Sequence, residues 1–176
     1  MADTSSNLAE QMGFLGRHFR NSNILRQVSD IEQSDLPELA KLVSIFLIRS
    51  QWIEYVTKRL VRLMGLYAND LSIGIIRTPT KKLDGLNLLP IIEILKEFAW
   101  SEGNNDIGDL CAELSNFNSL RNRYTHHLFS SDKKEEDMIR ELKKGLKLQT
   151  KLTESLDIAQ DRLLKIADRV DAKERS

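Results

Sequence analysis

Long stretches of helical periodicity constrain this chain more than any other feature. Its 176 residues include only 3 prolines and 8 glycines. Between them, apolar residues recur at every third or fourth position, which is the period of a helix packed on one face. Hydrophobic residues make up 41% of the chain, enough to bury a core and too much for a disordered chain. We therefore expect an all-α helical bundle.

The positions of the expected helices follow from this period and from residues that typically begin a helix. The predicted helices cover residues 36–67, 88–100, 106–116, 119–129 and 132–170. Asp35 with Glu38, and Asp132 with Glu135, have the spacing of a helix cap in which side chains satisfy free amides in both directions. Residues 1–33 are expected to form a peripheral N-terminal segment with a short helix, residues 34–172 the helical domain, and residues 69–85 a connecting loop.

The last predicted helix carries an apolar seam that is long for a domain of this size. Its members are Leu142, Leu146, Leu152, Leu156, Ala159, Leu163, Ile166 and Val170, with Gln149 as the polar exception. Two interpretations remain open at this stage. Part of the seam pairs with a partner helix, such as a second copy of itself, or the whole helix belongs to its own bundle and has a solvated end.

Charge is unevenly distributed along a chain whose 26 basic and 26 acidic residues give no net charge. Residues 41–82 hold eight basic and two acidic groups, residues 83–116 one basic and seven acidic groups, and residues 117–130 two basic groups and no acidic one. If the first and third stretches meet in the fold, their shared surface would attract a polyanion such as RNA. The alternative is that the basic and acidic helices pair with each other.

Several classes of protein are disfavoured. No stretch approaches the roughly 18 apolar residues of a membrane helix, and the first residues lack a signal-peptide pattern, so we expect a cytoplasmic protein without membrane contact. The single cysteine, Cys111, excludes an internal disulfide and a cysteine-rich zinc site, and its neighbours favour a buried side chain. Phosphate-binding glycine loops and zinc-hydrolase motifs are missing, and we expect no metal and no cofactor.

One short segment carries chemistry. Two of the three histidines lie in Arg121-Asn122-Arg123-Tyr124-Thr125-His126-His127. On a helix Asn122 and His126 share a face, whereas Arg121 lies about 140° from His126 and must reach around or be supplied by a second chain. An imidazole, a guanidinium and an amide suffice to cleave RNA without a metal. His126 would transfer a proton, Arg121 would stabilise phosphate charge and Asn122 would orient either group.

This segment resembles the motif of the HEPN superfamily, small α-helical domains marked by an Arg, a polar residue, three variable positions and a His. The resemblance covers about residues 36–165 and departs in the length of the final helix and in the loop at 69–85. It implies a HEPN-like helical bundle with a long C-terminal helix. In the ribonucleases of toxin–antitoxin and anti-phage systems, it further implies a homodimer that cleaves RNA where the motifs of two protomers meet.

Other residues are candidates for supporting roles. Arg123 and His127 form a second pair four residues apart and are candidates to assist catalysis. Glu54 is either the polar residue that many family members bring from an earlier helix to hold the motif, or a salt-bridge partner of Lys58, which we favour.

The RNA-binding candidates are basic or aromatic. Lys58, Arg59 and Arg62 are the predicted RNA-binding cations. Tyr124 and Trp100 are candidates to stack on bases, although aromatic residues at helical spacing more often belong to a core.

The leading hypothesis is a metal-independent endoribonuclease of the HEPN type, with RNA as substrate, a second copy at the site, and an antitoxin or another protein as regulator. One alternative is a non-catalytic HEPN-like module that binds a protein partner or a nucleotide. Another is a structural bundle in which the motif is coincidental. An open pocket at His126 would favour the first hypothesis, and a His126 packed in a dry core would exclude it.

Overall fold

The computed structural model describes residues 23–70, 83, 85–101, 105–127 and 133–174. Within helices, the side chains of residues 23–25, 65–70, 98–101, 105–106, 127 and 164–174 lie outside that description. The described residues form helices and no strand. The helices are α2 (Asn23–Glu32), α3 (Glu38–Asp70), α5 (Leu88–Ser101), α6 (Asn105–His127) and α7 (Glu135–Glu174). The expected all-α bundle with a long C-terminal helix is therefore confirmed.

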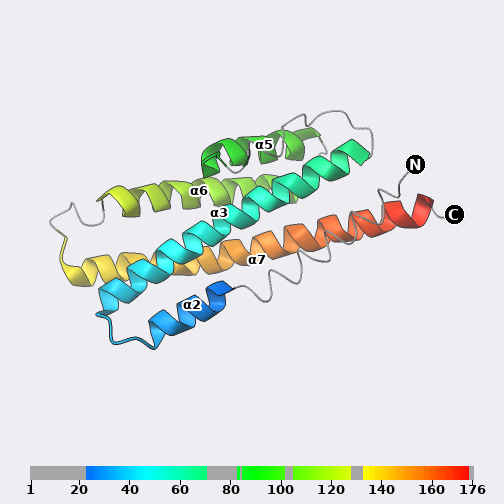
Figure 1. Cartoon of the computed structure of the whole chain (residues 1–176). Helices are drawn as coiled ribbons and strands as arrows, with labels where there is room; N and C mark the ends of the chain where they lie inside the picture. The colour runs from blue at the N-terminus through cyan, green and yellow to red at the C-terminus, as the bar shows by residue number, and fades with distance from the viewer. Residues whose placement is uncertain (1–22, 71–82, 84, 102–104, 128–132, 175–176) are drawn as a thin grey trace.

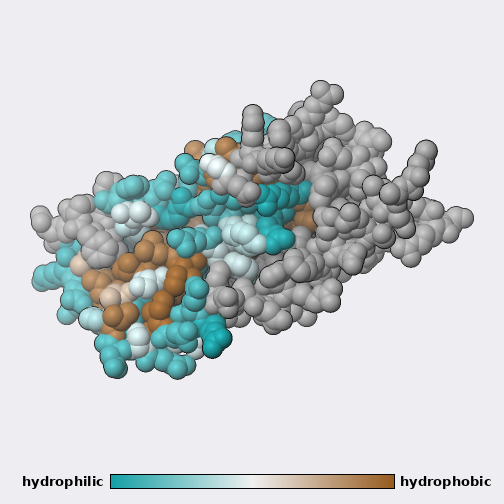
Figure 2. Space-filling view, in the orientation of Figure 1, coloured by the Kyte–Doolittle hydropathy of each residue, from teal (hydrophilic) through white to brown (hydrophobic). Residues whose placement is uncertain are grey.

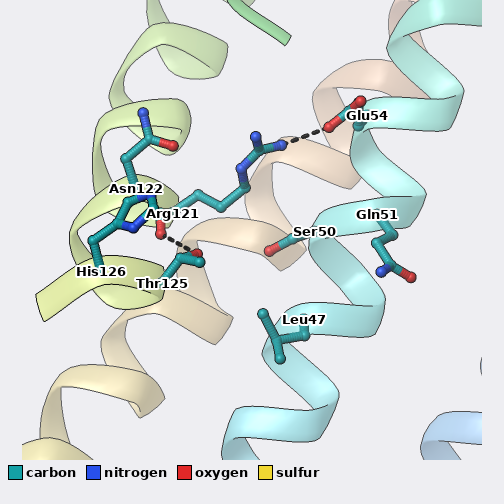
Figure 3. A pocket seen from close by; sticks show the side chains of 8 residues that line it. All are labelled: Leu47, Ser50, Gln51, Glu54, Arg121, Asn122, Thr125 and His126. Carbon is teal, nitrogen blue, oxygen red and sulfur yellow. Dashed lines mark hydrogen bonds and ion pairs between the residues drawn. The ribbon is translucent and has the colours of Figure 1, made fainter. Parts of the chain in front are cut away.

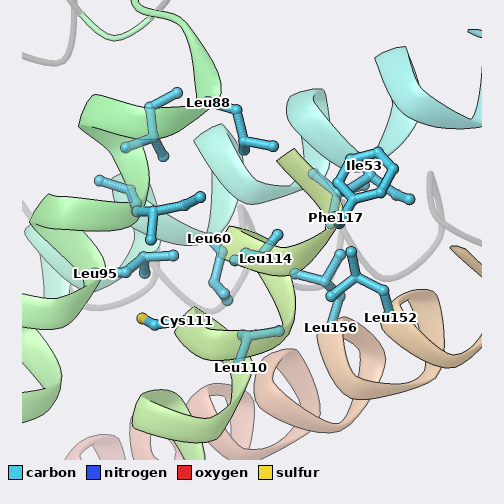
Figure 4. Close-up of a cluster of buried hydrophobic side chains, with 14 of the residues drawn as sticks. Ile53, Leu60, Leu88, Leu95, Leu110, Cys111, Leu114, Phe117, Leu152 and Leu156 are labelled. Atoms are coloured by element: carbon cyan, nitrogen blue, oxygen red, sulfur yellow. The ribbon is translucent and has the colours of Figure 1, made fainter. Parts of the chain in front are cut away.

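Three long helices form the centre of the molecule. In Figure 1, α3 and α7 run in the same direction and α6 runs opposite to both. Helix α5 packs on α6 and α3, and α2 packs on α3. The shared core draws side chains from four helices, among them Ile53 and Leu60 of α3, Leu95 of α5, Phe117 of α6 and Leu152 of α7 (Figure 4).

The seam of α7 is buried inside this bundle as far as its side chains are described. Leu142, Leu152, Leu156 and Leu163 are at most 5% exposed, and Leu146 and Ala159 pack against the same core. Gln149 is also buried, and its Nε2 donates hydrogen bonds to the Phe46 carbonyl and to Ser50 Oγ, both at 2.9 Å. Up to Leu163 the bundle interpretation holds, because the chain's own α3 and α6 cover the seam.

Helix α6 corrects one expectation. Residues 106–116 and 119–129 were expected to form two helices, but α6 is continuous from Asn105 to His127. In the polar stretch between them, the hydroxyls of Ser115 and Ser119 donate to the carbonyls four residues earlier. Phe117, in the same stretch, is fully buried and anchors it to the core.

Smaller differences occur at helix starts and near the amino terminus. The first helical hydrogen bonds of α3 and α7 run to the carbonyls of Pro37 and Lys134, so both helices begin two or three residues later than the cap pattern suggested. Helix α2 lies in the segment expected to be peripheral, and its Val28 is buried. Residues 1–22 of that segment and most of the loop at 69–85 lie outside the described residues.

Candidate functional site

An open pocket of about 280 Å³ lies between α3 and α6. Helix α3 contributes residues spaced three and four apart, and the carboxyl-terminal turns of α6 contribute the motif (Figure 3). The lining residues are Leu47, Ser50, Gln51, Glu54, Arg121, Asn122, Thr125 and His126. All three residues predicted to be catalytic therefore line one pocket, together with Glu54.

Arg121 reaches this pocket within a single chain. Its side chain extends from α6 towards α3, and its Nη1 donates to Glu54 Oε2 at 2.6 Å (Figure 3). Both side chains are partly shielded, with 22% and 23% exposure. Arg121 and His126 leave the helix in directions about 140° apart. The arginine side chain is long enough to overcome this difference, and both residues line the same pocket.

Glu54 binds two cations at once. Its Oε1 accepts a hydrogen bond from Lys58 Nζ at 2.8 Å, while Oε2 accepts the one from Arg121. The sequence left open whether Glu54 contacts the motif or pairs with Lys58, and the structure contains both contacts. Burial alone would raise the pKa of Glu54, but the hydrogen bonds and charges of Lys58 and Arg121 outweigh it and lower the pKa below 4.5. Glu54 is thus an ionised carboxylate at neutral pH and holds the guanidinium of Arg121 in place.

Asn122, Thr125 and His126 form the α6 wall. All three side chains are exposed, and the Thr125 hydroxyl donates to the Arg121 carbonyl at 2.8 Å. On the opposite wall, Ser50 is buried and its hydroxyl donates to the Phe46 carbonyl at 2.7 Å. His126 is therefore accessible to a ligand, as the catalytic hypothesis requires.

Tyr124 is a core residue, the more frequent outcome for an aromatic residue at helical spacing, and its ring is not available to stack on a base. It is 5% exposed, and its ring lies 5.0 Å from that of Phe46. Its hydroxyl donates to the Glu141 carbonyl of α7 at 2.6 Å. This contact fastens the last turns of α6 to α7 and fixes the helix that presents Arg121 and His126. The side chain of Trp100, the other stacking candidate, lies outside the description.

The remaining candidates lie away from the pocket or outside the description. Arg123 is exposed, does not line the pocket, and places its guanidinium carbon 5.5 Å from the centre of the Tyr124 ring. The side chain of His127 lies outside the described residues. The three predicted RNA-binding cations do not line the pocket either. Lys58 pairs with Glu54, Arg59 lies against Tyr55, and Arg62 is half-buried.

Helix α3, from the basic stretch at 41–82, meets the motif at this pocket, but the residues that it contributes to the lining include no basic one. The acidic stretch is partly neutralised elsewhere, since Glu93 pairs with Lys96 of its own helix and Glu113 with Lys151 of α7.

Cys111 is buried as expected. Among the described residues there is no cluster of three or more metal-ligating side chains. No described helix is long and apolar enough to cross a membrane.

Sequence reasoning missed the α3 wall apart from Glu54. Leu47, Ser50 and Gln51 carry no recognisable motif, but with Glu54 they follow the i, i+3, i+4, i+7 spacing of one helix face. The available signal was the pair of uncharged polar residues, Ser50 and Gln51, that precede Glu54 on the same face of the helix. No family model, no curated protein and no solved structure matches this chain.

Proposed function

We propose that this protein is an endoribonuclease of the HEPN type, of the toxin or phage-defence kind, and that the pocket between α3 and α6 is its active site. One observation carries the proposal: Arg121, Asn122 and His126 line a single open pocket. Imidazole, guanidinium and amide then border one space that a phosphodiester can enter, and geometry is the first requirement for acid–base catalysis.

In the proposed reaction, the 2′-oxygen of a ribose attacks the adjacent phosphorus and the bond from phosphorus to the 5′-oxygen breaks. His126 takes the proton of the 2′-hydroxyl or gives one to the departing 5′-oxygen, and water carries out the other transfer. Arg121 stabilises the charge on the non-bridging oxygens, and Asn122 orients the phosphate or the imidazole. The products are a 2′,3′-cyclic phosphate and a 5′-hydroxyl, and no metal takes part.

The ion pair with Glu54 is compatible with this role for Arg121. A guanidinium has five N–H donors, and the contact with Glu54 engages Nη1. The remaining donors can bind a phosphate while Glu54 keeps the group in position. Pre-positioned charge of this kind stabilises a transition state without reorganisation at the moment of reaction.

The proposal includes a homodimer in which a second copy covers the pocket. Leu47, which lines the pocket, is 42% exposed, and Leu36, two residues before the start of α3, is 47% exposed. Figure 2 shows apolar residues gathered over the first turns of α3 and the neighbouring α2. An apolar surface beside a polar site supports a protein contact there, and an antitoxin would compete for the same surface.

The experiment is RNA cleavage in the presence of a chelator, with end-group analysis of the products. We expect wild type to leave 2′,3′-cyclic phosphates. His126→Ala and Arg121→Ala should each lose about 100-fold or more in rate, the usual cost of removing an acid–base or charge-stabilising group. Arg140→Ala is the matched control, because Arg140 is an exposed arginine of α7 outside the pocket. Circular dichroism verifies that each variant is folded.

A wild-type protein that cleaves no RNA, together with unchanged toxicity of His126→Ala in cells, would contradict the enzymatic proposal. The apolar surface beside Leu47 favours one second candidate, a non-catalytic module that binds a protein partner or a nucleotide. RNA binding without cleavage, or a tight complex that survives Arg121→Ala, would support that candidate instead.

A further inference from the structure

Helix α3 carries an aromatic cluster that the proposed reaction does not use. Trp52 and Tyr55 stack with their ring centres 5.6 Å apart and their planes 25° apart. Four residues further along α3, the guanidinium carbon of Arg59 lies 5.3 Å from the centre of the Tyr55 ring. Arg59 Nη1 also donates a hydrogen bond to the Tyr55 hydroxyl. We call these three residues the Tyr55 cluster.

The cluster is accessible from solvent, although two of its three members are large aromatic residues. Tyr55 is 44% exposed, whereas Trp52 and Arg59 are half-buried. Trp52 packs partly against the core and so fixes the plane on which the Tyr55 ring lies. A rigid exposed aromatic ring with a cation against it is the arrangement with which proteins bind the bases of single-stranded nucleic acids.

The position of the cluster relative to the pocket is the second observation. Leu47 and Gln51 line the pocket, and Tyr55 and Arg59 continue the same row at steps of four residues along α3. Residues four apart form a ridge on a helix surface. Tyr55 is therefore one turn, or about 6 Å along the axis, from the pocket residue Gln51. One extended nucleotide spans such a distance.

The basic residues near the Tyr55 cluster also suit a nucleic acid, whose backbone is negatively charged. Lys58 lies between the cluster and the pocket and binds Glu54, and Arg59 and Arg62 follow on the same helix. A base that stacks on Tyr55 must displace the Arg59 guanidinium from the ring. The displaced cation then lies beside the phosphate of the same nucleotide, and it exchanges a weak ring contact for an ion pair.

We propose that the Tyr55 cluster binds the unpaired base next to the phosphodiester held in the pocket, so that the substrate is single-stranded RNA. This inference rests on the proposed function, since it places the scissile phosphate in the α3–α6 pocket. It assigns Tyr55 as a binding residue with Trp52 as its positioning residue. Paired bases are excluded, because a base in a duplex has no free face to offer to the ring.

The test uses binding and does not depend on cleavage. A fluorescent 2′-O-methyl oligouridine of about eight nucleotides cannot undergo 2′-oxygen attack, and its affinity for the full chain is measured by anisotropy. We expect Tyr55→Ala to weaken binding about 10-fold and Tyr55→Phe to retain it, because stacking needs the ring and not the hydroxyl. Leu89→Ala is the control, since Leu89 is an exposed apolar residue of α5.

A second measurement locates the base. Photocrosslinking of a 5-iodouridine oligonucleotide, followed by mass spectrometry, should modify Tyr55 in wild type and the same position in Tyr55→Phe. Unchanged affinity of Tyr55→Ala, equal loss in Leu89→Ala, or equal binding of a duplex of the same length would each overturn the inference. Tyr55-dependent binding without any cleavage would reject the proposed enzyme and leave the base-binding site standing.

Discussion

Gly145 of α7 allows the closest approach between that helix and the aromatic residues that support the motif. A methyl group added at Gly145 would lie 2.8 Å from Cε2 of Tyr124 and 3.0 Å from Cε2 of Phe46. Neither ring is free to move away. Tyr124 is held by its hydroxyl bond to the Glu141 carbonyl, one turn before Gly145, and Phe46 is 1% exposed in the core.

The expected effect of Gly145→Ala can be worked out from these contacts. Alanine is a better helix former than glycine by about 1 kcal/mol, which favours the variant. Forcing an extra methyl into a packed core costs about 1–3 kcal/mol. Because both rings are tethered, we take the upper part of that range and expect a net loss of about 1–2 kcal/mol. The strain falls on Tyr124, and therefore on the turn of α6 that carries the motif.

Gly108→Ala is the matched control. Gly108 lies in α6, is exposed, and has no heavy atom within 4 Å of an added methyl. Helix propensity alone should then stabilise the variant by about 0.5–1 kcal/mol. Urea unfolding followed by circular dichroism measures both changes, which should have opposite signs. If Gly145→Ala is as stable as wild type or more stable, the close approach of α7 to Tyr124 does not constrain the fold and the reasoning fails.

Two further predictions follow from shifted pKa values. Because the pKa of Glu54 is lowered in the fold, its ion pairs stabilise the protein above the unfolded value of 4.5 and lose that effect as the pH falls through the lower folded value. Glu54→Gln should therefore be less stable than wild type near pH 7, and the difference in urea midpoint should shrink as the pH falls below 4.5; a constant difference would contradict the assignment. Burial raises the pKa of the Cys111 thiol to about 11. Near pH 8 its thiolate fraction is then about 100-fold below that of an ordinary thiol, so Ellman's reagent should react at least that much more slowly until the protein is unfolded. Rapid labelling of the folded protein would show that Cys111 is accessible.

The helical periodicity predicted most of the fold, because burial of one face at a period of 3.6 is a local property of the sequence. Helices α3, α5 and α7 lie within a few residues of the predicted bounds. The break expected between residues 116 and 119 was wrong for a tertiary reason. Burial of Phe117 outweighs the weak helix propensity of its polar neighbours. A prediction from neighbouring residues alone does not include this burial.

The candidate site was predicted only on one side. The motif on α6 could be recognised from residue types and spacing, and Glu54 was recognised as a lone acid among bases. The α3 wall depends on the rotation of α3 against α6, which arises from core packing. The same packing decides that Tyr124 belongs to the core and does not stack on bases: its ring faces Phe46, while Arg121 and Thr125 line the pocket.

The continuity of α6 has a consequence for how the proposed site would fail. Leu110 and Leu114 in the buried half and Asn122 and His126 at the pocket belong to one helix without a hinge residue between them. Tyr124, two residues before His126, fastens the end of this helix to α7, so the pocket wall depends on the packing of α6 against α7. On heating, ligand binding at the pocket and the helical signal should disappear in one cooperative step.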